Sequence, residues 1–143
     1  MKVFAIAIYS HILKYYNGLF EKLLKEYQIT QVEVDVLAFL ANNPEYCYAQ
    51  DIVEVRKISK AHVSIAIEKL VKRGYLIRQP DPKNRRCNIL KITDQANEIV
   101  CDIKEIQETF NQQIYADLSK EERAIYDQYL VKMYKNIGGK VDE

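Results

Sequence analysis

The sequence predicts a mainly α-helical chain with one short two-stranded β-hairpin near its middle. Apolar residues recur at three- and four-residue steps over most of the chain, which is the period of amphipathic helices. Two short runs rich in β-branched and apolar residues, at positions 75–79 and 87–92, flank a segment with the turn formers Asp81-Pro82 and Asn84. Basic residues concentrate in the same region. Helices around a hairpin with a basic tip are therefore expected.

Composition limits the possibilities. A chain of 143 residues that is 48% apolar and 29% charged fits a single domain, so we expect one domain over residues 1–143. The N-terminal apolar run from Val3 to Tyr9 is too short for a signal peptide or a membrane span. Cys47, Cys87 and Cys101 lack metal-binding spacing, so reduced thiols in a cytoplasmic protein without a metal or other cofactor are predicted.

The net charge of +1 hides a strongly uneven distribution. Between Arg56 and Lys91 there are eleven basic residues and only two acidic ones, Glu68 and Asp81, whereas the rest of the chain carries ten basic and eighteen acidic residues. A segment with this excess of positive charge is typical of proteins that bind a polyanion such as nucleic acid.

The N-terminal half contains four predicted helices. The first ~27 residues have one apolar stripe and are expected to form one long helix. Thr30 and Glu33 make a capping box that begins the next helix, which ends near Asn42. A short helix from Ala49 to Val55 follows, and then a helix that Ser59 caps and that ends before Gly74.

The C-terminal part adds two long helices after the hairpin. Thr93 is expected to cap one of them, and the other is expected to begin at a second capping box, Ser119 with Glu122. The element order predicts a winged helix-turn-helix over residues 30–92, flanked by helices at 1–29 and 93–138. These flanking helices carry apolar stripes that one small core cannot bury, so they are predicted to form a homodimer.

In a winged helix-turn-helix, the last helix before the hairpin enters the major groove of DNA. Here Val63, Ala66, Ile67, Leu70 and Val71 share its core face, and the opposite face contains the candidates for DNA contact. Methyl groups of Ala61 and Ile65 suit the C5-methyl group of thymine, so a T-rich half-site is predicted. The candidate residues are Ser59, Lys60, Ala61, His62, Ser64, Ile65 and Lys69.

The predicted wing tip is a second candidate site. Its polar and basic side chains are Lys83, Asn84, Arg85 and Arg86. Extended guanidinium groups on such a projection suit the narrow, electronegative minor groove of A·T-rich duplexes.

Several of these segments resemble the MarR family of bacterial regulators. The similarity rests on Ser59-Lys60, on 70–76 (LVKRGYL), on 81–86 (DPKNRR) and on Ile92-Thr93, with Asn84 in place of the family's wing Asp. The resemblance implies that Arg86 is the wing arginine and that the chain binds a palindromic operator as a homodimer. It also implies a small aromatic or phenolic effector, bound where the dimer helices meet the DNA-binding lobe.

Other interpretations remain open. The side chains of Tyr9, His11, Tyr15 and Tyr16 could line such an effector pocket, or simply pack in the dimer. Cys87 follows the basic wing tip and is either a redox-sensitive thiolate or an inert small side chain. The sequence lacks a catalytic motif, so an enzyme is not expected. The main alternative to a regulator is a winged helix that acts as an architectural DNA binder or a protein-interaction module without ligand response.

Overall fold

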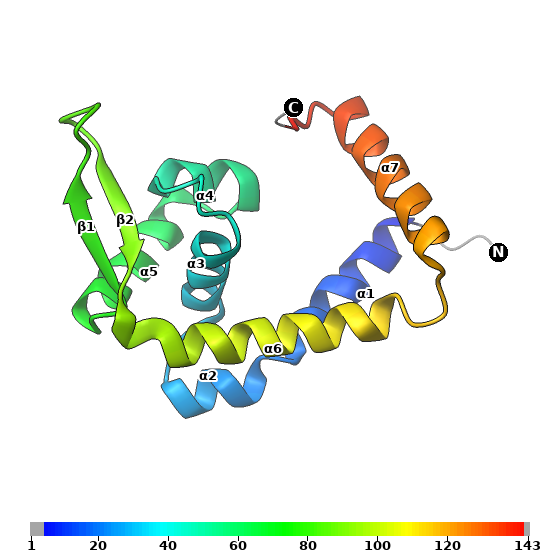
Figure 1. Ribbon diagram of the computed structural model, residues 1–143, viewed down its shortest axis with the longest axis horizontal. Helices are drawn as coiled ribbons and strands as arrows, with labels where there is room; N and C mark the ends of the chain where they lie inside the picture. The colour runs from blue at the N-terminus through cyan, green and yellow to red at the C-terminus, as the bar shows by residue number, and fades with distance from the viewer. Residues whose placement is uncertain (1–4, 142–143) are drawn as a thin grey trace. The chain divides into compact units, whose positions relative to one another are not determined.

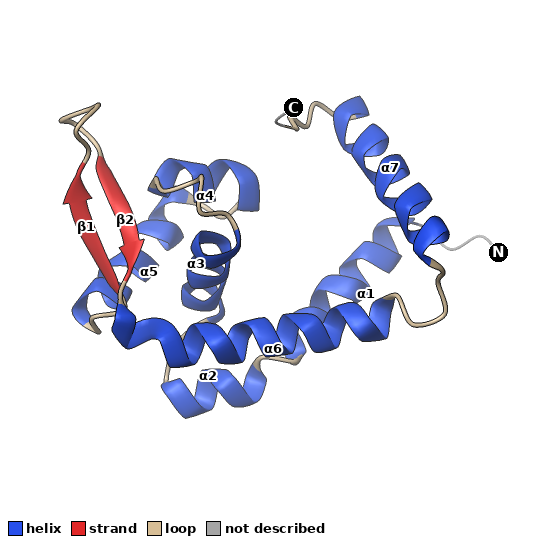
Figure 2. Cartoon of the chain, viewed as in Figure 1, coloured by secondary structure: helices blue, strands red, loops and turns tan. Residues whose placement is uncertain are grey.

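The computed structural model describes residues 5–141, which are mainly helical (Figures 1 and 2). Their elements are α1 (Ala5–Gly18), α2 (Glu21–Tyr27), α3 (Gln31–Asn42), α4 (Ala49–Arg56), α5 (Lys60–Lys72), β1 (Leu76–Pro80), β2 (Asn88–Ile92), a 3-10 turn (Asp94–Ala96), α6 (Asn97–Ile114) and α7 (Lys120–Asn136). The predicted fold class is confirmed. The chain divides into two compact units, residues 1–108 and 109–143.

The prediction of one continuous N-terminal helix was wrong. The helix stops at Gly18 and a new one begins at Glu21. Glycine is a poor helix former, and the break allows Phe20 to turn fully into the core, where its ring meets Tyr16 edge-on at 5.1 Å. The first four residues of the predicted helix lie outside the described part of the chain.

Helix starts follow the capping signals in the sequence. In the first capping box, the backbone N–H of Thr30 donates to the Glu33 carboxylate at 2.6 Å, and the Thr30 hydroxyl accepts from the backbone N–H of Glu33. Ser119 and Glu122 form the same reciprocal pair at the start of α7. Each box satisfies backbone N–H groups that have no partner within the helix, so both helix starts are confirmed where predicted.

One apolar core holds the first unit together. It joins Phe20 before α2, Leu37 in α3, Leu70 in α5, Leu76 in β1 and Ile103 in α6, each at most 1% exposed. Burying a side chain of this size contributes about 1.5–3 kcal/mol. Since α3, α5 and α6 all contribute to this core, the orientation of α5 is fixed by the packing of its neighbours.

The hairpin β1–β2, with the turn between its strands, is called the wing below and spans residues 76–92. Its antiparallel register pairs Leu76 with Ile92 and Pro80 with Asn88. The predicted strands are confirmed to within a residue at each end. The backbone N–H of Leu90 also donates to the carbonyl of Cys47 at 2.8 Å, which attaches the loop before α4 to the wing.

The base of the wing is bonded to both neighbouring helices. Gly74 adopts φ +78°, a left-handed conformation that glycine tolerates best, and it ends α5. The hydroxyl of Thr93 donates to the carbonyl of Gly74, and the backbone N–H of Thr93 donates to the carbonyl of Tyr75 at 3.0 Å. Thr93 was expected to cap the following helix, but its side chain makes no capping bond there because it binds Gly74 instead.

In the second unit, α7 presents a strongly apolar surface. Ile125, Tyr129 and Met133 are 50%, 56% and 45% exposed in the single chain. Within the same unit, Tyr115 packs edge-on against Tyr126, and the Arg123 guanidinium lies 4.1 Å from the centre of the Tyr115 ring.

Candidate nucleic-acid interface

Helix α5, called the recognition helix below, is seated by its apolar face. The Ser59 hydroxyl caps its start by accepting the backbone N–H of His62 at 3.2 Å. Val63, Ala66 and Leu70 are buried against the core. The prediction of which face packs inward is therefore confirmed.

The opposite face is open to solvent. Ile65 is 55% exposed, a high value for a large apolar side chain in a helix that otherwise buries such residues. All of the helix residues singled out from the sequence are exposed: Ser59, Lys60, Ala61, His62, Ser64, Ile65 and Lys69.

The wing is anchored by a buried carboxylate. Asp81 is only 3% exposed, and it accepts a short hydrogen bond from the Tyr48 hydroxyl and another from the backbone N–H of Lys83 at 2.9 Å. The bond from Tyr48 is the main cause that lowers the pKa of Asp81, and it raises the pKa of Tyr48 to about 12. Asp81 thus acts in the wing turn, not as a charge on the surface.

Asn84 organises the wing tip. Its side-chain carbonyl accepts the backbone N–H of Arg86 at 3.2 Å, and its amide lies 3.3 Å from the sulfur of Cys87. An amide therefore takes the acceptor position in this turn, while Lys83, Arg85 and Arg86 remain exposed. The Cys87 side chain is half-buried under this turn.

A hollow of about 750 Å³ lies between the recognition helix, the start of α4 and the wing. Lys60 and Ser64 line it from the helix, and Arg78, Asn84 and Arg86 line it from the wing. The structure thus brings together residues from the two segments predicted separately. Ala61, His62, Ile65 and Lys69 are exposed but do not line this hollow.

Several residues that line this hollow were not among the sequence candidates, among them Arg78, Tyr48 and Gln50. Arg78 was counted in the basic segment but not singled out, because its place opposite the recognition helix depends on the register of the wing. Tyr48 and Gln50 line the hollow from the start of α4. Their only signal in the sequence was proximity to a predicted helix start.

Three arginines of the basic segment are engaged within the protein, and the first of them, Arg56, pairs with Asp35. Arg73 donates from its guanidinium to the carbonyls of Tyr27 at 2.6 Å and Gln28 at 2.9 Å, at the end of α2. Arg78 pairs with Glu68 at 2.9 Å. In the described part of the chain, Arg78 is the only basic residue between positions 57 and 91 that makes an ion pair.

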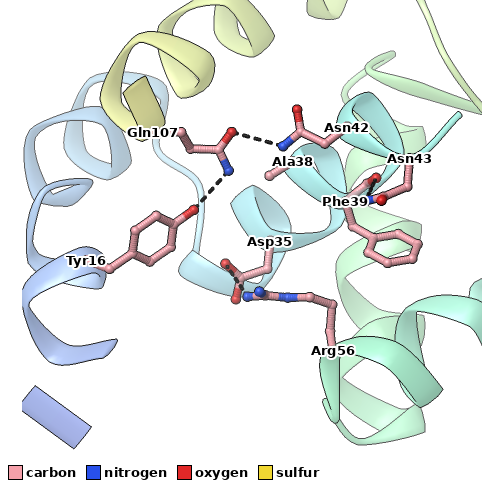
Figure 3. Close-up of a pocket in the computed structure, with 8 residues that line it drawn as sticks. All are labelled: Tyr16, Asp35, Ala38, Phe39, Asn42, Asn43, Arg56 and Gln107. Atoms are coloured by element: carbon pink, nitrogen blue, oxygen red, sulfur yellow. Dashed lines mark hydrogen bonds and ion pairs between the residues drawn. The ribbon is translucent and has the colours of Figure 1, made fainter. Parts of the chain in front are cut away.

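A second, smaller cavity of about 100 Å³ lies among α1, α3, α4 and α6 (Figure 3). The Tyr16 hydroxyl accepts from the Gln107 amide at 3.0 Å, and Asn42 donates to the Gln107 carbonyl at 3.0 Å. On the other side, Arg56 pairs with Asp35 at 3.3 Å. Burial raises the pKa of Asp35, although bonds from Gln31 and the charge of Arg56 oppose that rise.

The structure separates the candidate effector residues. Tyr16 lines the cavity of Figure 3. His11 and Tyr15 instead line an open surface hollow with Lys14 and Leu19. Tyr9 is 45% exposed and lines neither of these two sites.

Among residues 5–141, no three His, Cys, Asp or Glu side chains are grouped so as to hold a metal ion. Of the helices in that part of the chain, none combines the length and apolar character needed to span a bilayer.

Comparison with known proteins gives consistent results. The sequence model of the MarR family matches residues 27–86. The chain is 30% identical over 112 residues to the uncharacterized HTH-type transcriptional regulator YkoM of Bacillus subtilis, covering 78% of this chain and 70% of that protein. It is 29% identical over 102 residues to the HTH-type transcriptional regulator BilQ of Clostridioides difficile, covering 71% of this chain and 68% of that protein.

Solved structures show the same fold. A putative MarR family regulator from Listeria monocytogenes, solved in complex with a 26mer DNA, superimposes with a TM-score of 0.79 at 20% identity and covers all of both chains. Family sequence, curated relatives and fold agree, and all of them concern transcriptional regulators and not enzymes. The chain therefore belongs to the MarR family of winged helix-turn-helix transcriptional regulators.

Proposed function

We propose that the chain binds double-stranded DNA sequence-specifically as a homodimer, on a palindromic and A/T-rich operator, and represses transcription in the cytoplasm. The observation that carries this proposal is the hollow between the recognition helix and the wing. Lys60 from the helix and Arg86 from the wing line it without an ion pair in the described part of the chain, beside a helix face with exposed side chains. Such a concave basic surface complements a phosphate backbone.

The recognition helix is proposed to select bases in the major groove. Its N-terminal half carries the exposed residues Ala61, His62, Ser64 and Ile65, and this half of the helix reaches base edges in proteins of this architecture. The methyl groups of Ala61 and Ile65 favour thymine at the positions they contact. Ser59, Lys60 and Lys69 are proposed to contact phosphates on either side.

The wing tip is proposed to enter the adjacent minor groove. Asn84 fixes the backbone of the turn at Arg86, so the guanidinium group projects from an ordered tip. Lys83 and Arg85 add positive charge beside it. A narrow A·T-rich minor groove has the negative potential that favours an inserted arginine.

The homodimer is proposed to form through the flanking helices at 1–29 and 93–138, which leaves residues 30–92 as the DNA-binding lobe. Each of α1 and α7 exposes large apolar side chains in the single chain, such as Ile6 and Leu13 in α1 and Tyr129 and Met133 in α7. A second copy of the same chain offers identical apolar faces, and a two-fold axis then matches a palindromic site.

A small aromatic or phenolic effector is proposed to bind at the cavity of Figure 3 and release the DNA. Arg56 suits a carboxylate, whereas Tyr16 and Gln107 suit a hydroxyl group. The cavity of about 100 Å³ is smaller than the ~150 Å³ that holds a benzene ring, so the Tyr16 ring must move for an aromatic ligand to enter.

The DNA-binding proposal is tested by selection from a random duplex library, followed by titration at several salt concentrations. Two half-sites about 10 bp apart, an affinity roughly 10³-fold above that for mixed sequence, and a steep loss of affinity with salt are expected. An architectural binder would show the salt dependence without the selectivity. A protein-interaction module would show neither.

The effector proposal is tested by titrating benzoate and phenol derivatives into the protein–operator complex. If Arg56→Gln weakens the release of DNA and the neighbouring control Lys57→Gln does not, the result supports this cavity as the effector site. Release that is equally strong in both variants would exclude it.

A further inference from the structure

Glu68 is an unusual residue on a surface proposed to meet DNA. Between positions 56 and 91 the chain has two acidic residues, and the other one, Asp81, is buried in the wing turn. Glu68 is therefore the only exposed carboxylate in the basic segment. A carboxylate beside a phosphate backbone is repelled by it, so its presence there requires an explanation.

The position of Glu68 along the helix argues against base contact. It lies nine residues after the cap Ser59, in the C-terminal half of the recognition helix, whereas the N-terminal half reaches base edges. Ser64, one turn earlier on the same edge, lines the hollow that faces the wing. Glu68 is thus placed toward the wing and the phosphates.

Its partner is Arg78 of β1, which lines the same hollow. The Arg78 guanidinium donates to the Glu68 carboxylate at 2.9 Å, and the two side chains are 36% and 53% exposed. The arginine is the main cause that lowers the pKa of Glu68, so the carboxylate is charged at neutral pH. An ion pair this exposed adds little to folding stability.

We propose that Glu68 limits sequence-independent DNA binding by holding Arg78 in a neutral pair, so that the arginine does not bind phosphates of arbitrary sequences. This inference rests on the proposed DNA-binding function. Other basic side chains that line the hollow, Lys60 and Arg86, have no ion pair within residues 5–141 and are available to phosphates. Glu68 and Arg78 together would then determine how much of the affinity depends on charge alone.

The size of the effect follows from counterion release. One additional phosphate contact makes the plot of log K against log salt steeper by about 0.9, which corresponds to roughly fivefold tighter binding at 0.15 M salt. In loose complexes with mixed sequence a released arginine can find any nearby phosphate. On an operator the base contacts fix the geometry, so the same arginine gains less and selectivity falls.

The test compares Glu68→Gln, Arg78→Gln and the double variant on a mixed-sequence duplex and on the duplex recovered by selection. E68Q should steepen the salt dependence by about 0.9 and bind mixed sequence about fivefold more tightly, with a smaller gain on the selected duplex. R78Q alone should leave the slope unchanged, and in the double variant it should cancel the effect of E68Q. Glu26→Gln on α2 is the control for the change in net charge.

Three results would overturn the inference while the wild-type protein still binds DNA. They are an unchanged slope in E68Q, a slope reduced by about 0.9 in R78Q alone, or equal gains on both duplexes. A purely structural role predicts a shift of the urea midpoint without any change in slope. If the wild-type protein binds no duplex at all, the proposed function itself fails and this inference fails with it.

Discussion

Arg73 gives the sharpest test of the structure, because sequence and structure assign it different roles. By charge it belongs to the basic segment, but its guanidinium donates two hydrogen bonds to the carbonyls of Tyr27 and Gln28. It therefore links the end of the recognition helix to the C-terminal end of α2, where a cation is also favoured by the helix dipole. We predict that Arg73→Ala weakens folding and leaves the salt dependence of DNA binding unchanged.

The magnitude follows from the exposure of these bonds. Hydrogen bonds to a charged group contribute about 1.5–3 kcal/mol when buried, but Arg73 is exposed, so about 1–2 kcal/mol for both together is expected. With a urea m-value near 2 kcal/mol/M, the unfolding midpoint should fall by about 0.5–1 M. Variants are compared at one protein concentration, because dimerisation makes stability depend on concentration.

Two further variants complete this experiment. Arg73→Lys retains the charge but cannot donate the same pair of hydrogen bonds, so it should restore only part of the stability that Arg73→Ala loses. Lys72→Ala removes a neighbouring exposed charge and should leave the midpoint nearly unchanged. An unaltered midpoint in R73A, together with a salt slope reduced by about 0.9, would refute the structural assignment and make Arg73 a phosphate contact.

Three other predictions concern the interface and the polar cavity. Arg86→Ala should weaken binding mainly to operators with A·T-rich wing positions, as measured by titrating duplexes that differ only there; equal losses on all duplexes would remove the wing from the minor groove. Ile65→Arg should shift one selected position from thymine toward guanine by about 1–3 kcal/mol, and an unchanged motif would show that Ile65 does not face the bases. Because burial raises the pKa of folded Asp35 above its ordinary value of 3.8, its contribution to stability is most favourable below that pH and declines as pH rises. Asp35→Asn should therefore gain stability relative to wild type as the pH rises above 3.8 in urea titrations, whereas parallel pH profiles would contradict this.

Local signals in the sequence predicted most of the elements. Thr30, Ser59 and Ser119 were identified as caps from short-range patterns, and the structure shows their capping bonds. The faces of the recognition helix followed from the helical period alone. These features depend on residues three or four positions apart, which is why sequence reasoning reached them.

Features that depend on distant partners could not be predicted. The break before Phe20 reflects burial in a core to which the later elements from α2 to α6 contribute. The partners of Arg73 lie about 45 residues away in sequence, and the pairing of Arg78 with Glu68 requires the register of the wing. The polar cavity likewise joins Tyr16 to Gln107 across 91 residues, so that nothing near Tyr16 in the sequence distinguished it from Tyr15.

The bonds at Thr93 have a mechanical consequence. This residue begins the segment that leads into α6, and it binds Gly74 and Tyr75, two of the residues that join the recognition helix to the wing. A rotation of α6 about its axis would therefore displace the recognition helix and the wing together. If both elements bind the duplex as proposed, a signal transmitted through α6 would weaken both contacts at once.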